Sequence, residues 1–193
     1  YKDGMFVLGD EEKDDEVFAL RPMTCPFQYQ AYLNRKRSYR DLPLRYNETS
    51  TLFRNEASGE MHGLIRVRQF TISEGHLMCT PEQLEDEFRK CLELAIFMLK
   101  TLGLYEDVSY RFSQWDPNDR EKYIGTEEQW NEAQGLMERI LNHLEIPYEI
   151  GIGEAAFYGP KLDIQIKNVY GKEDTLITIQ IDQMLAEQFG MVY

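Results

Sequence analysis

The sequence predicts an α+β fold in which an antiparallel β-sheet is flanked by helices. Two observations support this: β-type runs follow one another along the chain, and the helical segments are inserted between them instead of alternating with single strands. The 193 residues, 42% hydrophobic and 28% charged, are enough for a hydrophobic core. We therefore expect a single domain over residues 1–193, and not a doubly wound parallel sheet.

The first half of the chain is expected to contain two pairs of strands and one helix. Short strands are predicted at 5–8 and 17–20, a helix at 26–40, and longer strands at 47–57 and 63–79. Ser58-Gly59-Glu60 is a turn of the kind that joins hairpin strands. In the second long strand the period of two places alternate residues, Leu64, Arg66, Arg68 and Phe70, on one face.

The second half is expected to contain two helices and four strands. Thr80 as N-cap and Pro81 at the first helical position begin a helix that ends at Gly103. Thr126 and Gln129 form a capping box, which begins a helix that reaches about Leu144. The predicted strands, rich in β-branched and aromatic residues, lie at 105–115, 147–152, 161–169 and 175–182.

Composition restricts the environment and the partners. The net charge of −13 argues against this chain binding a nucleic-acid backbone by itself. No apolar run approaches the ~20 residues that a membrane span needs. Three cysteines are too few for a disulfide scaffold, so we expect a cytoplasmic protein. Because the chain begins at Tyr1 and ends on apolar residues, we also expect a piece of a longer protein.

One group of residues suits a nucleoside triphosphate. Arg54 and Arg66 offer forked donors to phosphate oxygens, Glu56 can accept from an adenine amino group, and Phe70 offers a flat face to a base. The sequence contains neither a P-loop nor a dinucleotide fingerprint, so any ATP site is of another type. The alternative is that arginines on strands simply face water.

Two further groups carry polar chemistry. Cys25 and His76 are good zinc-ligand types, but a zinc site needs at least three protein ligands, and a buried cysteine and a surface histidine remain the alternative. Tyr158 and Lys161 flank a Gly-Pro turn, and Thr178 and Gln180 share one face of the last strand. These four residues face either water or a ligand.

At these positions the chain closely resembles the catalytic domain of the threonyl-tRNA synthetase family, within the class II aminoacyl-tRNA synthetases. The similar stretches, in the order of that family, are Arg21–Pro26, Tyr39–Arg45, Phe53–Glu56, Ser58-Gly59, His62–Phe70, His76 with Cys79-Thr80, Ala156–Lys161 and Thr178–Asp182. They are spread over nearly the whole chain, which makes the resemblance far more specific than any single motif.

The resemblance implies a role for each residue. Arg54, which would hold the ATP α-phosphate, and Lys161, near the reacting groups, would be catalytic. The implied ATP-binding residues are Arg54, Glu56, Arg66, Phe70, Thr178 and Gln180. The implied amino-acid-binding residues are Met23, Glu74, Tyr158 and Gln180. Cys25 and His76 would be two of three ligands of a Zn²⁺ ion that binds the amino and hydroxyl groups of threonine, and Mg²⁺ would accompany ATP.

The chain departs from the family pattern in three ways. Phe27-Gln28 stands where the family often has Gly-His, Glu74 replaces an aspartate, and Ile72 replaces a glutamine. The last two positions lie beside the substrate amino group in the family, so they bear on the geometry of threonine recognition. We expect a divergent member with unchanged specificity.

The resemblance also implies a longer parent protein. Its partners would be ATP, threonine, tRNA(Thr) and a second copy of itself in a homodimer. It would not associate with a membrane. Motif 1 would precede this chain, and the third zinc ligand, motif 3 and the anticodon-binding domain would follow it. We therefore expect the isolated 193 residues to bind zinc weakly and to be inactive. The alternatives are a class II synthetase for serine or proline, and a synthetase-like paralogue that binds ATP or an amino acid without catalysis.

Overall fold

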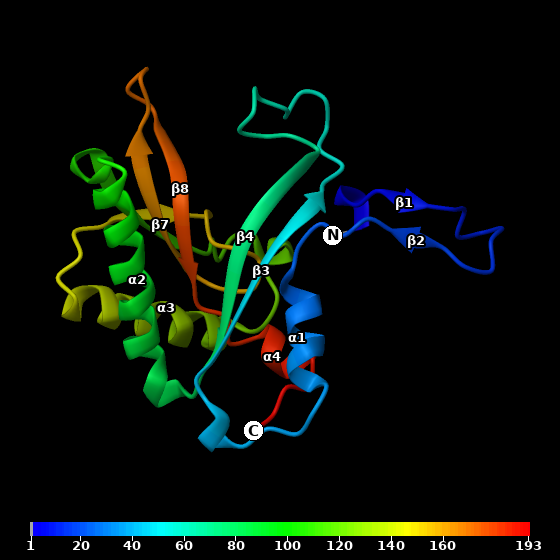
Figure 1. Ribbon diagram of the computed structural model, residues 1–193, viewed down its shortest axis with the longest axis horizontal. Helices are drawn as coiled ribbons and strands as arrows, with labels where there is room; N and C mark the ends of the chain where they lie inside the picture. The colour runs from blue at the N-terminus through cyan, green and yellow to red at the C-terminus, as the bar shows by residue number, and fades with distance from the viewer. Residues whose placement is uncertain (1) are drawn as a thin grey trace. The chain divides into compact units, whose positions relative to one another are not determined.

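Two groups of secondary-structure elements build the chain in the computed structural model, which describes residues 2–193 (Figure 1). The N-terminal unit is Tyr1–Met78 together with Tyr193, and the C-terminal unit is Cys79–Val192. Each unit is described by itself. No helix of residues 2–193 has the length and apolar character needed to cross a membrane.

The N-terminal unit contains two antiparallel strand pairs and one α-helix. Its elements are the 3-10 turn η1 (Lys2–Gly4), β1 (Val7–Leu8), β2 (Phe18–Ala19), α1 (Cys25–Leu33), the 3-10 turn η2 (Tyr39–Asp41), β3 (Leu44–Phe53) and β4 (Gln69–Met78). β1 pairs with β2, and β3 pairs with β4 from Leu44 opposite Met78 to Phe53 opposite Gln69. The helix predicted at 26–40 ends earlier than expected, at Leu33.

The prediction for the second long strand was wrong over its first six residues. Residues 54–68 form a loop, and β4 begins only at Gln69. Two tight turns shape this loop, with hydrogen bonds from Glu60 N to Ala57 O at 2.9 Å and from Ile65 N to His62 O at 3.0 Å. Leu64, Arg66 and Arg68 alternate in sequence, but here the ladder with β3 has already ended, so they share no strand face with Phe70.

Two amphipathic helices and a four-stranded sheet form the C-terminal unit. The helices are α2 (Leu84–Thr101), preceded by the 3-10 turn η3 (Pro81–Gln83), and α3 (Glu127–His143); the short η4 (Tyr105–Asp107), η5 (Arg120–Lys122) and α4 (Leu185–Gln188) lie between or after the larger elements. The predicted start of α3 is confirmed, whereas the predicted start at Thr80 and Pro81 is that of the 3-10 turn η3, and α2 begins at Leu84. Thr80 and Gln83 form a capping box before α2, and the Thr126 side chain accepts from Gln129 N before α3.

The sheet has the strand order β6-β5-β7-β8, with β5 (Val108–Gln114), β6 (Glu149–Ile152), β7 (Lys161–Lys167) and β8 (Glu173–Gln180). β7 runs antiparallel to both β5 and β8, as expected. β5 and β6 are parallel, since α3 lies between them in the chain and returns it to the same end of the sheet. β7 is thus the inner strand whose two neighbours are both antiparallel.

Helices α2 and α3 pack their apolar sides against this sheet (Figure 1). The buried cluster unites side chains of both helices and of β5 and β7: Phe88, Leu92, Ala95, Leu99, Tyr110, Phe112, Met137, Ile140, Leu141, Leu162 and Ile164, together with Ile181. A second cluster is built on Trp130, which is fully buried, stacks on Trp115 at 5.4 Å between centroids and donates its Nε1–H to Ile124 O at 2.7 Å. These contacts leave the polar side of β7 away from the helices.

Candidate functional site

Arg54 lies at the first position after β3 and is held by the neighbouring backbone. Its amide N donates to Arg68 O at 2.9 Å, and its Nε donates to Pro22 O at 3.2 Å. The guanidinium carbon lies 5.0 Å from the centroid of the Phe70 ring, within the range of a cation–π contact. The structure therefore places a fixed positive group beside a flat aromatic ring, and both belong to the four residues that the sequence predicted for a nucleotide.

Glu56 holds the 54–68 loop together through contacts with Arg66 and Arg68. Glu56 Oε2 accepts from Arg66 Nε at 3.0 Å, and Glu56 O accepts from Arg68 Nε at 3.0 Å. The Glu56 side chain is only 13% exposed, whereas that of Arg66 is 53% exposed. The predicted adenine-binding carboxylate and the predicted phosphate-binding arginine thus meet in one ion pair.

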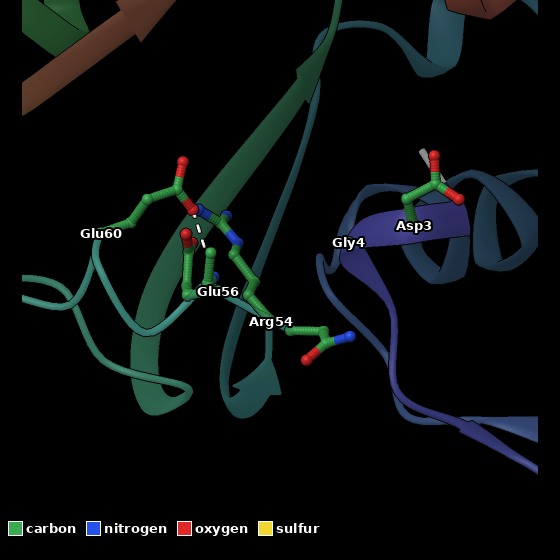
Figure 2. Close-up of a pocket in the computed structure, with 7 residues that line it drawn as sticks. Asp3, Gly4, Arg54, Glu56 and Glu60 are labelled. Atoms are coloured by element: carbon green, nitrogen blue, oxygen red, sulfur yellow. Dashed lines mark hydrogen bonds between the residues drawn. The ribbon is translucent and has the colours of Figure 1, made fainter.

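Two open cavities lie beside this loop. The first, of about 440 Å³, is lined by residues from both the chain start and the loop: Asp3, Gly4, Arg54, Asn55, Glu56, Ala57 and Glu60 (Figure 2). Ala57 N donates to Glu60 Oε2 at 3.2 Å, one of the interactions along its wall. Because three carboxylates and a single arginine line this cavity, it suits a polyanion poorly.

The second cavity, of about 330 Å³, fits the predicted nucleotide site better. It is lined by Arg54, Glu56, Ile65, Arg66, Val67 and Phe70, and so contains two arginines and a single carboxylate. Its volume is in the range of small-molecule sites. All four residues that the sequence predicted here, Arg54, Glu56, Arg66 and Phe70, line it together.

A candidate metal-binding group lies where α1 begins, against the C-terminal part of β4. The ligand atoms of Cys25, Glu74 and His76 all lie within 4.8 Å of one another. Thr24 Oγ1 donates to Glu74 Oε2 at 2.6 Å, and His76 Nδ1 shares a hydrogen bond of 3.0 Å with Gln28 Oε1. Met23, predicted to contact the amino acid, is partly buried two residues before Cys25.

The donor set fits zinc, since a thiolate, an imidazole and a carboxylate are the ligand types that zinc prefers. The sequence predicted Cys25 and His76 as ligands and assigned Glu74 to the amino acid; the structure places all three in one group. Phe70, Ile72, Glu74 and His76 are the alternate, less exposed residues of β4. One face of a single strand therefore runs from the aromatic group of the nucleotide cavity to the metal-ligand types.

The predicted residues of the C-terminal unit form a second polar group. Tyr158 donates its hydroxyl to Gln180 Oε1. Lys161, at the start of β7, forms an ion pair with Asp163, and Thr178 Oγ1 donates to Asp163 Oδ1 at 2.8 Å. A Cβ atom on Gly159 would lie 2.0 Å from Ile181 O, so only glycine allows the turn before Lys161 to approach β8 this closely.

Asp163 is the polar residue that sequence reasoning missed. It lies two positions after Lys161 in the same strand, and this spacing, which places both side chains on one face, was the available signal. The polar group of the C-terminal unit thus contains four predicted residues and one more that binds two of them.

Comparison with known proteins gives a consistent result. Residues 6–193 match the family described as tRNA synthetase class II core domain (G, H, P, S and T). The threonine–tRNA ligase of Clostridium perfringens is 68% identical over all 193 residues, which make up 30% of its length. The chain spans about 30% of the length of such relatives.

Two solved structures agree with this match. The structure titled as the RNA binding domain of threonyl-tRNA synthetase from Cryptosporidium parvum Iowa II has a TM-score of 0.86 and 35% identity, and the match covers 98% of this chain and 45% of that one. A putative threonyl-tRNA synthetase, ThrRS-1, from Aeropyrum pernix has a TM-score of 0.81 and 29% identity, with 99% and 44% covered. The predicted α+β fold is confirmed by these neighbours.

Proposed function

We propose that this chain, which belongs to the family of class II tRNA synthetase core domains, forms part of the catalytic core of a threonine–tRNA ligase. The family match runs from residue 6 to residue 193, so we propose that both units belong to this one catalytic domain. The observation that carries the choice of threonine is the group formed by Cys25, Glu74 and His76, in a chain that is 68% identical to threonine–tRNA ligases.

The proposed reaction of the whole protein has two steps. A threonine carboxylate oxygen attacks the α-phosphorus of ATP in line, the bond to the β-phosphate oxygen breaks, and threonyl-adenylate and pyrophosphate form. The threonyl group then passes to tRNA(Thr), and AMP leaves. Nucleotidyl transfer of this kind needs positioned groups and neutralised charge more than covalent help from the protein.

The residues around the 330 Å³ cavity would bind ATP. Arg54 would hold the α-phosphate, and its contacts with Pro22 O and the Phe70 ring support this role because they fix the direction of the guanidinium. Phe70 would stack on adenine, and Glu56 would accept from its amino group. Arg66 would add positive charge at the phosphates, which Mg²⁺ would accompany.

The residues predicted for the metal and the amino acid would bind and select threonine. Cys25 and His76 would hold a zinc ion, whose chemistry is to bind an amino and a hydroxyl group together and so to select against valine, which lacks the hydroxyl. Glu74 belongs to the same group, but we propose it as an amino-acid contact and expect the third zinc ligand outside these 193 residues. The residues that would contact the amino acid are Met23, Glu74, Tyr158 and Gln180. Thr178 and Gln180 would also contact ATP. Lys161 would supply the positive charge beside the reacting carboxylate. We further propose that the whole protein is a cytoplasmic homodimer.

The test is amino-acid-dependent ATP–pyrophosphate exchange by the full-length protein, with serine, valine and proline as competing substrates. We expect robust exchange with threonine alone and close to one zinc per chain, lost together with threonine selectivity on Cys25→Ala. Cys91→Ala is the matched control, because Cys91 lies on α2 and belongs to no metal-ligand group of the described residues. Exchange driven by serine or proline, or no exchange at all, would contradict the proposal.

A further inference from the structure

A buried carboxylate lies at the centre of the polar group in the C-terminal unit. Asp163 is 2% exposed and belongs to β7, the strand between β5 and β8. Ser113 Oγ donates to its Oδ2 at 2.6 Å, Thr178 Oγ1 donates to its Oδ1 at 2.8 Å, and the Lys161 ammonium pairs with Oδ2. Both oxygens are thus bound, by groups from three different strands.

The strand registers bring these four side chains together. Asp163 and Lys161 are two residues apart on β7, so they share a face. Thr178 of β8 is the direct partner of Asp163, and Ser113 of β5 is the direct partner of Lys161. The sheet therefore places one hydroxyl on each side of the carboxylate and the ammonium in front of it.

Stability alone does not account for this arrangement. The backbone ladders already join β5, β7 and β8, and a buried ion pair is often no more stabilising than apolar residues of the same volume. The other face of β7 shows that alternative, with Leu162 and Ile164 fully buried in the core. A lysine side chain also has high rotamer entropy, so an unpaired ammonium would be poorly placed.

We infer that Asp163 is a positioning residue for amino-acid activation, which holds the Lys161 ammonium and the Thr178 hydroxyl at fixed points on the polar face of the C-terminal sheet. This inference rests on the proposed function, because it assigns Asp163 to the site of the same reaction. Asp163 acts through its two neighbours and touches neither substrate. An asparagine oxygen at this position can still accept from the Thr178 hydroxyl, so removing the charge should act on kcat mainly through Lys161.

A double-mutant cycle in the full-length protein tests this. Asp163→Asn keeps the size of the side chain and removes the charge. We expect it to lower kcat of threonine-dependent exchange about 100-fold with little change in KM for ATP, the loss that a displaced group typically causes. In a Lys161→Met background the same change should cost less than about threefold, because interacting residues are not additive. Equal losses in both backgrounds would show a general structural role and would overturn the inference.

Two further variants keep the test decisive if Asp163→Asn does not fold. Ser113→Ala removes one donor from the carboxylate oxygen that binds Lys161. It should lower kcat when Lys161 is present and leave kcat unchanged in the Lys161→Met background. An unchanged kcat with Lys161 present would overturn the inference. Asp86→Asn, which breaks an exposed ion pair with Lys90 on α2, is the matched control and should leave kcat unchanged. If the wild-type protein shows no threonine-dependent exchange, the proposed function fails; if it is active and the losses are additive, only this inference fails.

Discussion

Lysine in place of Arg54 would keep the charge but lose the contacts that aim it. The arginine Nε donates to Pro22 O at 3.2 Å while the guanidinium carbon lies 5.0 Å from the Phe70 ring centroid. A lysine ammonium has no second nitrogen and no planar face, so it cannot hold Pro22 O, cover the ring and offer a fork to phosphate at once. We therefore expect Arg54→Lys to impair ATP use although the charge of the cavity is unchanged.

The size of the effect follows from the two lost contacts. A hydrogen bond from a charged donor contributes about 1.5 to 3 kcal/mol, and a cation–π contact near the surface contributes about 0.5 to 1 kcal/mol. Their sum is about 2 to 4 kcal/mol. At 1.36 kcal/mol for each factor of ten, kcat/KM for ATP should fall about 30- to 900-fold.

The assay is ATP–pyrophosphate exchange by the full-length protein at varied ATP and saturating threonine. Arg120→Lys is the matched control, since Arg120 also donates to a carbonyl, Gly125 O at 3.0 Å, and covers a ring, Trp115 at 4.9 Å, but lines neither cavity. It should leave kcat/KM for ATP unchanged. A less than twofold change on Arg54→Lys, or an equal loss in the control, would refute the reasoning.

Three further predictions concern stability and reactivity. Trp130→Phe should lower the free energy of unfolding by about 2 kcal/mol in urea titrations, because it leaves the Ile124 carbonyl without its donor and weakens the aromatic cluster; a change below about 0.5 kcal/mol would contradict this. Thr126→Ala should cost about 1 kcal/mol through the lost helix cap, whereas Thr101→Ala, near the exposed end of α2, should cost less than half of that. Burial, then nearby negative charge, raises the pKa of Cys79 to about 11, so its thiolate is scarce at pH 8 and grows as pH approaches 11. Iodoacetamide should therefore label Cys79 much more slowly at pH 8 in the native protein than after unfolding, and equal rates by mass spectrometry would exclude this shift.

Local sequence signals predicted the helices of the C-terminal unit well. The start of α3 depends on a capping box between Thr126 and Gln129, and α2 follows a similar box at Thr80. In such boxes the deciding hydrogen bonds join residues three positions apart, so the sequence itself contains the whole interaction. The predicted end at Gly103 also agrees, since this glycine has φ of +72° just after α2.

Long-range pairing explains what local signals could not predict. Residues 64–68 alternate like a strand, but a strand needs a partner, and β3 ends before it can pair with them. The parallel pairing of β5 with β6 likewise depends on the path of α3 between them. Asp163 was missed for the same reason, because its partners Ser113 and Thr178 lie 50 and 15 positions away in sequence and meet it only in the sheet.

The contacts of Glu56 have a consequence for binding entropy. One side-chain oxygen and the backbone carbonyl of this residue tie Arg66 and Arg68 to the opposite end of the 54–68 loop, so the loop already has one arrangement in the folded chain. Ordering a free loop costs about 1 to 2 kcal/mol per residue in backbone entropy, which lowers affinity when it occurs on binding. Here that loss occurs on folding. A ligand that enters between Arg54 and Arg66 would meet donors already in place, and it would have to compete only with the carboxylate that holds Arg66 there.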